Sequence, residues 1–73
     1  MNLYAIRRYR PDQPPERLAA AVSAKTAQEA LARTAPDCAS WKFRTDEDGS
    51  GWLVNPDNPE EFVLAYRLPI PGK

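Results

Sequence analysis

The densest group of chemically useful side chains is Arg7-Arg8-Tyr9-Arg10, near the start of the 73-residue chain. Arginine pairs with phosphates and carboxylates, and tyrosine stacks on bases or fills interface pockets. Sheet-surface binders of single-stranded nucleic acid use both residue types, and both are enriched in the hot spots of protein interfaces. The run therefore predicts a binding surface, with Tyr4 on the same segment as a further aromatic anchor.

The charge of the whole chain favours a protein partner over nucleic acid. Ten Lys and Arg balance ten Asp and Glu, and the pI of about 6.2 lies below the basic range expected of a nucleic-acid-binding domain. We predict protein binding through the exposed face of this segment and, if its edge is unpaired, by addition of a partner strand. A nucleic-acid-binding module is the alternative. The predicted contact residues are Tyr4, Arg7, Arg8, Tyr9 and Arg10.

The size of the chain suggests a role for such a binding protein. Small inhibitors and adaptors, including phage-encoded proteins that block a host enzyme such as RNA polymerase or a nuclease, have chains of similar length. We therefore expect a phage-type inhibitor or regulator, an expectation that rests on size alone. The oligomeric state stays open.

Catalytic chemistry has little support in the sequence. The chain has no histidine, which is the commonest general base. Cys38 is the only cysteine, and Asp37 beside it would raise the pKa of its thiol. One cysteine without histidine cannot hold zinc. We expect a protein that is not an enzyme and that has no cofactor.

The acidic run Asp46-Glu47-Asp48-Gly49-Ser50-Gly51 partly matches a calcium-binding loop. The position that should hold a bidentate glutamate is Asp57, and strand-forming residues flank the run where helices should lie. A polar hairpin turn explains the same residues, so no metal is predicted. A second candidate surface, suited to a basic partner, consists of Asp46, Glu47 and Asp48.

The single cysteine excludes an internal disulfide and favours a reducing compartment. The sequence shows no signal-like apolar run and no stretch near the ~20 apolar residues of a membrane span. We therefore expect a cytoplasmic protein without a membrane segment, folded as a single domain over residues 1–73.

The segments that must position these residues are mainly strands. Residues 3–10 alternate as a strand, with Tyr4, Ile6, Arg8 and Arg10 on one face. Residues 11–15 form a loop because three of the five are prolines.

Residues 16–35 allow two interpretations. Leu18 and Leu31 would point in different directions on one long helix, which favours a strand over residues 16–24 followed by a helix. That helix would begin at the capping box Thr26-x-x-Glu29 and end before Pro36. The single long helix stays as the alternative. The strand would place one set of residues on its inner face: Leu18, Ala20, Val22 and Ala24.

Residues 41–54 are predicted to form a β-hairpin that anchors the core through Trp41, Phe43, Trp52 and Val54. Residues 55–61 would be a loop, residues 62–68 a central strand, and residues 69–73 a frayed tail. The predicted fold is α+β: a mostly antiparallel sheet with one short helix packed on one face, in the order β-β-α-β-β-β.

Overall fold

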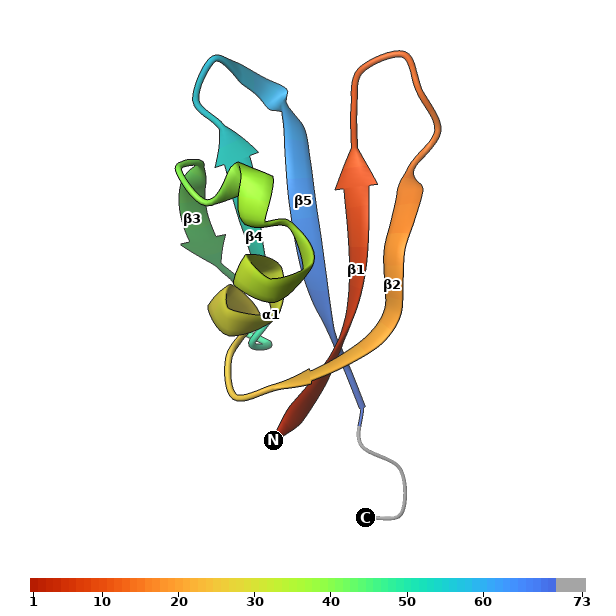
Figure 1. The fold of residues 1–73 in the computed structure, drawn as a ribbon, viewed down its shortest axis with the longest axis vertical. Helices are drawn as coiled ribbons and strands as arrows, with labels where there is room; N and C mark the ends of the chain where they lie inside the picture. The colour runs from red at the N-terminus through yellow and green to blue at the C-terminus, as the bar shows by residue number, and fades with distance from the viewer. Residues whose placement is uncertain (70–73) are drawn as a thin grey trace.

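The chain forms one antiparallel sheet with a helix against one of its faces, as the computed structural model shows for residues 1–69, which are those it describes (Figure 1). The predicted element order is confirmed. A short 3₁₀ turn, Pro36–Cys38, follows the helix. The elements are β1 (Asn2–Tyr9), β2 (Glu16–Ala24), α1 (Ala27–Thr34), β3 (Lys42–Thr45), β4 (Gly51–Asn55) and β5 (Asn58–Leu68).

The strand order across the sheet is β2-β1-β5-β4-β3. The last strand, β5, therefore lies in the centre, as its apolar content predicted. Because β1 pairs with both β2 and β5, it has no unpaired edge, and the addition of a partner strand at β1, which the sequence left open, is excluded. Among residues 1–69 the free edges belong to β2 and β3. The place of β1 inside the sheet results from its pairing with β5, which is distant in the sequence, so no local pattern reveals it.

The strand interpretation of residues 16–24 is confirmed, but their alternation is not regular. Register irregularities between β1 and β2 interrupt the period of two. As a result Ala20 is exposed, although the alternation predicted it inside. The residues of β2 that do pack against or within the core are Leu18, Ala19, Val22 and Ala24.

The predicted capping box starts α1. The Thr26 hydroxyl accepts a hydrogen bond from the Glu29 amide at 3.1 Å, while the Glu29 carboxylate accepts one from the Lys25 amide, also at 3.1 Å. Both bonds satisfy backbone N–H groups that a helix start leaves without partners. Pro36 follows the end of the helix, as predicted. The inner face of α1 consists of Ala27, Ala30 and Leu31.

Small residues let α1 lie close to the sheet. A Cβ atom on Gly51 would be only 2.9 Å from the Cβ of Ala27 and from Cε1 of Phe43. The layer between helix and sheet is the hydrophobic core of the protein. Its largest fully buried side chains are Tyr4, Ile6, Leu31, Val63 and Cys38.

The β3–β4 hairpin has a register that corrects the predicted core. Phe43 pairs with Leu53, and the loop is fixed by a 2.8 Å hydrogen bond from the Asp46 amide to the Ser50 carbonyl. Leu53 is therefore buried, and its neighbours Trp52 and Val54 point to the opposite face. The prediction that Trp52 and Val54 are core residues is wrong. Trp41 and Phe43 do pack against the core.

The loop predicted for residues 55–61 is shorter, because β5 begins at Asn58. An irregular register between β4 and β5 at Val54 and Asn55 accommodates Pro59, which has no N–H group for the ladder. Residues 70–73 of the predicted tail lie outside the described residues.

Candidate binding surface

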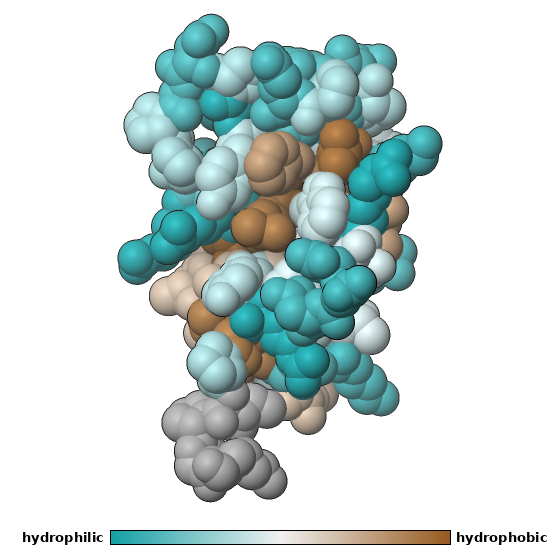
Figure 2. Space-filling view, turned by 180° about the vertical axis from the view of Figure 1, so that it is seen from behind, coloured by the Kyte–Doolittle hydropathy of each residue, from teal (hydrophilic) through white to brown (hydrophobic). Residues whose placement is uncertain are grey.

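The face of the sheet opposite α1 is uncovered in residues 1–69, and we call it the open face. Apolar side chains form patches along it, with less hydrophobic side chains between them and polar side chains on both sides (Figure 2). The strand pairing places residues of all five strands on this face. They are Leu3, Ala5, Arg7, Tyr9, Arg17, Ser23, Lys42, Arg44, Trp52, Val54, Phe62, Leu64, Tyr66 and Leu68.

One line of directly opposed residues crosses the whole open face, and we call it the central row. It consists of Arg17, Arg7, Leu64, Trp52 and Arg44, one from each strand. Directly opposed residues of antiparallel strands project to the same side. The central row therefore has an apolar middle, with two arginines on one flank and one on the other.

A second line, which we call the aromatic row, lies beside the central row. It runs from Tyr9 through Phe62 and Val54 to Lys42. The rings of Tyr9 and Phe62 stack with centroids 4.8 Å apart and an interplanar angle of 17°. One face of each ring is thereby covered by the other ring, which fixes both side chains on the sheet surface.

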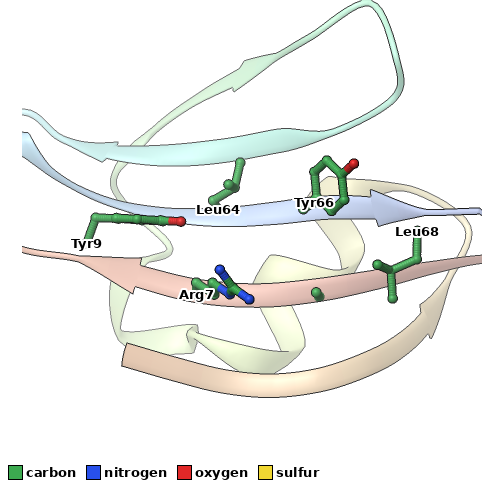
Figure 3. Close-up of a pocket in the computed structure, with 6 residues that line it drawn as sticks. Arg7, Tyr9, Leu64, Tyr66 and Leu68 are labelled. Carbon is green, nitrogen blue, oxygen red and sulfur yellow. The ribbon is translucent and has the colours of Figure 1, made fainter. Parts of the chain in front are cut away.

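A shallow depression of about 350 Å³ lies along β1 and β5 on the open face (Figure 3). Its lining comes from alternate residues of the two strands, which point away from α1. Tyr66 on its border is 51 % exposed. The depression offers apolar walls and two tyrosine hydroxyls to a partner group. Its lining residues are Ala5, Arg7, Tyr9, Leu64, Tyr66 and Leu68.

The charges that the pairing places on the open face are all basic: Arg7, Arg17, Lys42 and Arg44. All four side chains are exposed. Within residues 1–69 no salt bridge or side-chain hydrogen bond of these four groups is found, whereas Arg8, Arg10 and Arg33 each have a carboxylate partner. Arg7 and Arg17 lie directly opposite each other, an arrangement that destabilises a strand pair through like-charge repulsion. An anionic group on this flank would remove that repulsion.

The structure divides the residues predicted to form one binding surface. Arg7 and Tyr9 lie on the open face. Tyr4 is only 2 % exposed and belongs to the core, so its prediction as a surface anchor is corrected. The alternation of β1 explains this, since Tyr4 and Ile6 point toward α1 while Arg7 and Tyr9 point away.

Arg8 and Arg10 form ion pairs with carboxylates of the same chain. Arg8 donates a 2.8 Å hydrogen bond to Glu61 and lies 3.5 Å from an Asp37 carboxylate oxygen. Its guanidinium also lies over the Trp41 ring, 5.5 Å from the centroid. Arg10 is 3.7 Å from the same Glu61 carboxylate. The side chains of Arg8 and Glu61 are only 17 % and 18 % exposed, so this ion pair is largely buried.

The Arg8–Glu61 pair shifts the titration of both groups. The hydrogen bond from Arg8, followed by one from Asn55, lowers the pKa of Glu61 below its usual value. The hydrogen bond to Glu61 outweighs burial and raises the pKa of Arg8. The pair stays charged at neutral pH, which suits a structural ion pair.

Cys38 does not have the environment of a reactive thiol. Its side chain is fully buried. Burial first, and then the negative charge of Asp37, raise the pKa of the thiol. Because the thiolate is the nucleophilic form, Cys38 serves as a small core residue.

The acidic run forms the β3–β4 turn, and its carboxylates bind its own backbone. The Asp46 carboxylate accepts from the Glu47 amide at 2.7 Å, and the Asp48 carboxylate accepts from the Ser50 amide at 2.8 Å. In the described part of the chain no three Asp, Glu, His or Cys side chains gather as metal ligands would. Asp46, Glu47 and Asp48 are exposed. Their role as a second binding surface stays a prediction.

Sequence reasoning missed the residues in the middle of the open face, above all Trp52 and Leu64. Alternation along the strand predicted for residues 62–68 puts four of the open-face residues on one side: Phe62, Leu64, Tyr66 and Leu68. The missing signal was the hairpin register, which adds Trp52 and Val54 to the same face.

Comparison of the chain with models of protein families, with curated proteins and with solved structures finds no match. None of the helices in residues 1–69 combines the length and apolar character that crossing a membrane requires. The function of the chain must therefore be inferred from the residues of this surface.

Proposed function

We propose that this protein is a non-enzymatic binding domain whose open face contacts another protein. The observation that carries the proposal is the apolar middle of the central and aromatic rows, which no helix covers within residues 1–69. Its residues are the half-buried Trp52, Val54, Phe62 and Leu64. Apolar surface left in water favours association with a complementary surface. The arginines at its border belong to the residue types that contribute most to protein interfaces.

The composition of this face supports a protein partner over nucleic acid. Binding of single strands depends on free aromatic faces and an excess of positive charge. Here Tyr9 and Phe62 stack on each other, the middle of the central row contains aliphatic Leu64, and the chain has no net charge.

A domain of this kind acts by covering part of its partner's surface. An inhibitor or regulator of a larger enzyme is the form of this function that we favour, because the chain offers a contact surface and no chemistry of its own. A cytoplasmic location is part of the proposal and rests on the single, free Cys38.

Site-specific photocrosslinking in cells tests the proposal. A photoreactive residue replaces Tyr66 on the open face, and in a control chain it replaces Gln28, which is exposed on α1. We expect a discrete protein adduct from position 66 and none from position 28. The adduct should disappear when Leu64→Asp is added and persist when Lys25→Gln is added.

Two readouts keep this experiment decisive. Circular dichroism and urea unfolding establish that the Leu64→Asp chain is folded, and Trp52→Ser serves as a second variant of the open face. Adducts that are equal at both positions, or that survive both open-face substitutions, would contradict the proposal. A crosslink between position 66 and nucleic acid would replace the proposal with the alternative function, which is nucleic-acid binding.

A further inference from the structure

We infer that the partner group received by the open face is an amphipathic α-helix with acidic side chains on both flanks. Its apolar side would lie over Leu64 and Trp52, and its carboxylates would meet Arg7 on one side and Arg44 on the other. This inference rests on the proposed function, because it specifies the chemistry of the partner on the same face.

The width of the apolar middle fits a helix. Arg7 is on β1 and Arg44 on β3, with β5 and β4 between them. Three strand spacings of about 4.8 Å separate the two arginines by roughly 14 Å. An α-helix with its side chains is about 10–12 Å across, so one helix fills the space between the flanks.

The length of the surface sets the length of the helix. The open-face positions of β5 extend from Phe62 to Leu68, which is about 20 Å at 3.3 Å per residue. A helix rises 1.5 Å per residue, so about 13 residues cover that length.

The charges select an acidic partner. The pairing places Arg7 and Arg17 on one flank and Lys42 and Arg44 on the other, and the four have no carboxylate partner within residues 1–69. Carboxylates on both sides of an apolar helix face would complement both flanks and speed association.

The same charges argue against a second copy of the chain. In a face-to-face dimer with two-fold symmetry, each flank meets either itself or the other flank. Because both flanks are basic, either arrangement brings like charges together around the apolar middle.

Three labelled peptides of about 14 residues test the inference. They share one apolar helix face and carry Glu, Gln or Lys at the flanking positions. Binding to the full chain is measured by fluorescence anisotropy at low salt. We expect the Glu peptide to bind about tenfold more tightly than the Lys peptide, with the Gln peptide between them.

Substitutions then locate the effect. Arg7→Gln combined with Arg44→Gln removes one charge from each flank and should reduce the preference for the Glu peptide to about threefold or less. The matched control, Lys25→Gln, removes an exposed charge near the start of α1 and should leave the preference unchanged. Added salt should weaken the Glu peptide more than the Gln peptide.

The remaining outcomes separate this inference from the proposed function. If all three peptides bind equally and all lose binding in Leu64→Asp, the open face docks a helix but the acidic chemistry is wrong. Failure of every peptide to bind overturns the inference, while crosslinking at position 66 still decides the proposed function. Displacement of the Glu peptide by a single-stranded oligonucleotide, or a dimer in sedimentation that Leu64→Asp dissociates, also overturns it.

Discussion

The covered face of the sheet combines large core side chains with small residues beneath α1, whereas most apolar side chains of the open face are large. On the covered face small residues such as Ala65 and Gly51 meet Ala27 and Ala30 of α1, and all four are buried. On the open face the residues are large, including Trp52, Phe62 and Leu64. The small residues allow the eight-residue helix to lie close, and residues 1–69 contain no second helix that covers the other face. This asymmetry shows that apolar content alone does not identify a core.

The arginines of the two faces also differ in their partners. Arg8, at one end of the covered face, is held by Glu61, whereas Arg7 and Arg44 on the open face have no such partner among residues 1–69. Neighbouring residues of one strand thus serve different purposes. Arg8 stabilises the fold, and Arg7 is available for binding.

The largest expected difference between the faces is in the stability that is lost when a leucine is replaced by alanine. Leu31→Ala on the covered face should cost about 2–5 kcal/mol, because Leu31 is fully buried and a cavity would remain. That loss is comparable to the whole stability expected of so small a domain. Leu64→Ala on the open face should cost about 1 kcal/mol or less, since Leu64 is already partly exposed.

Urea unfolding of the two variants measures this difference directly. A loss in Leu64→Ala as large as that in Leu31→Ala would show that the open face is covered in solution. Dependence of that loss on protein concentration would identify a second copy as the cover.

Added side-chain volume beneath α1 should have a smaller effect on stability. Gly51→Ala places a Cβ atom 2.9 Å from Ala27 and Phe43, and overpacking of this kind costs about 1–3 kcal/mol. Ala5→Val is the matched control, because it adds methyl groups in the depression of the open face. Its melting temperature should stay within a few degrees of the wild type. A neutral Gly51→Ala would mean that α1 is not held close to the sheet.

The smallest expected effect is the pH dependence of the Arg8–Glu61 pair. The pKa of Glu61 is lowered from its usual 4.5 in the folded chain, first by the hydrogen bond from Arg8. Its stabilising contribution is therefore fully present above the unfolded pKa and is lost as the pH falls through the folded pKa.

Melting temperatures of wild type and Glu61→Gln between pH 7 and pH 3 test this. The wild type should be more stable at pH 7, and the gap should narrow below about pH 4.5. Arg44→Gln on the open face should show no such narrowing. A gap that is constant with pH would mean that Glu61 is not held as a charged partner.

Much of the fold followed from local signals, while the site depended on register. Pro36 and the Thr26–Glu29 pair located the helix, since proline and capping act through neighbouring backbone groups. Local signals could not show on which face of the sheet Trp52 and Val54 lie. A change of one residue in hairpin register turns every side chain to the opposite face, and the turn from Asp46 to Ser50 sets that register.

The sequence by itself indicated the order of elements, the ends of α1 and the alternation of β1 and β5, because these depend on residues close together in the chain. The apolar content of β5 indicated its central place, which its pairing with the distant β1 establishes. Only the tertiary structure decided that Tyr4 and Arg8 are held within the protein while Arg7 and Tyr9 stay on its surface. It also placed Trp52 and Arg44 on the same face of the sheet as Arg7 and Tyr9. The reason is that one short helix can cover only one face, and which face it covers depends on contacts between residues far apart in the chain.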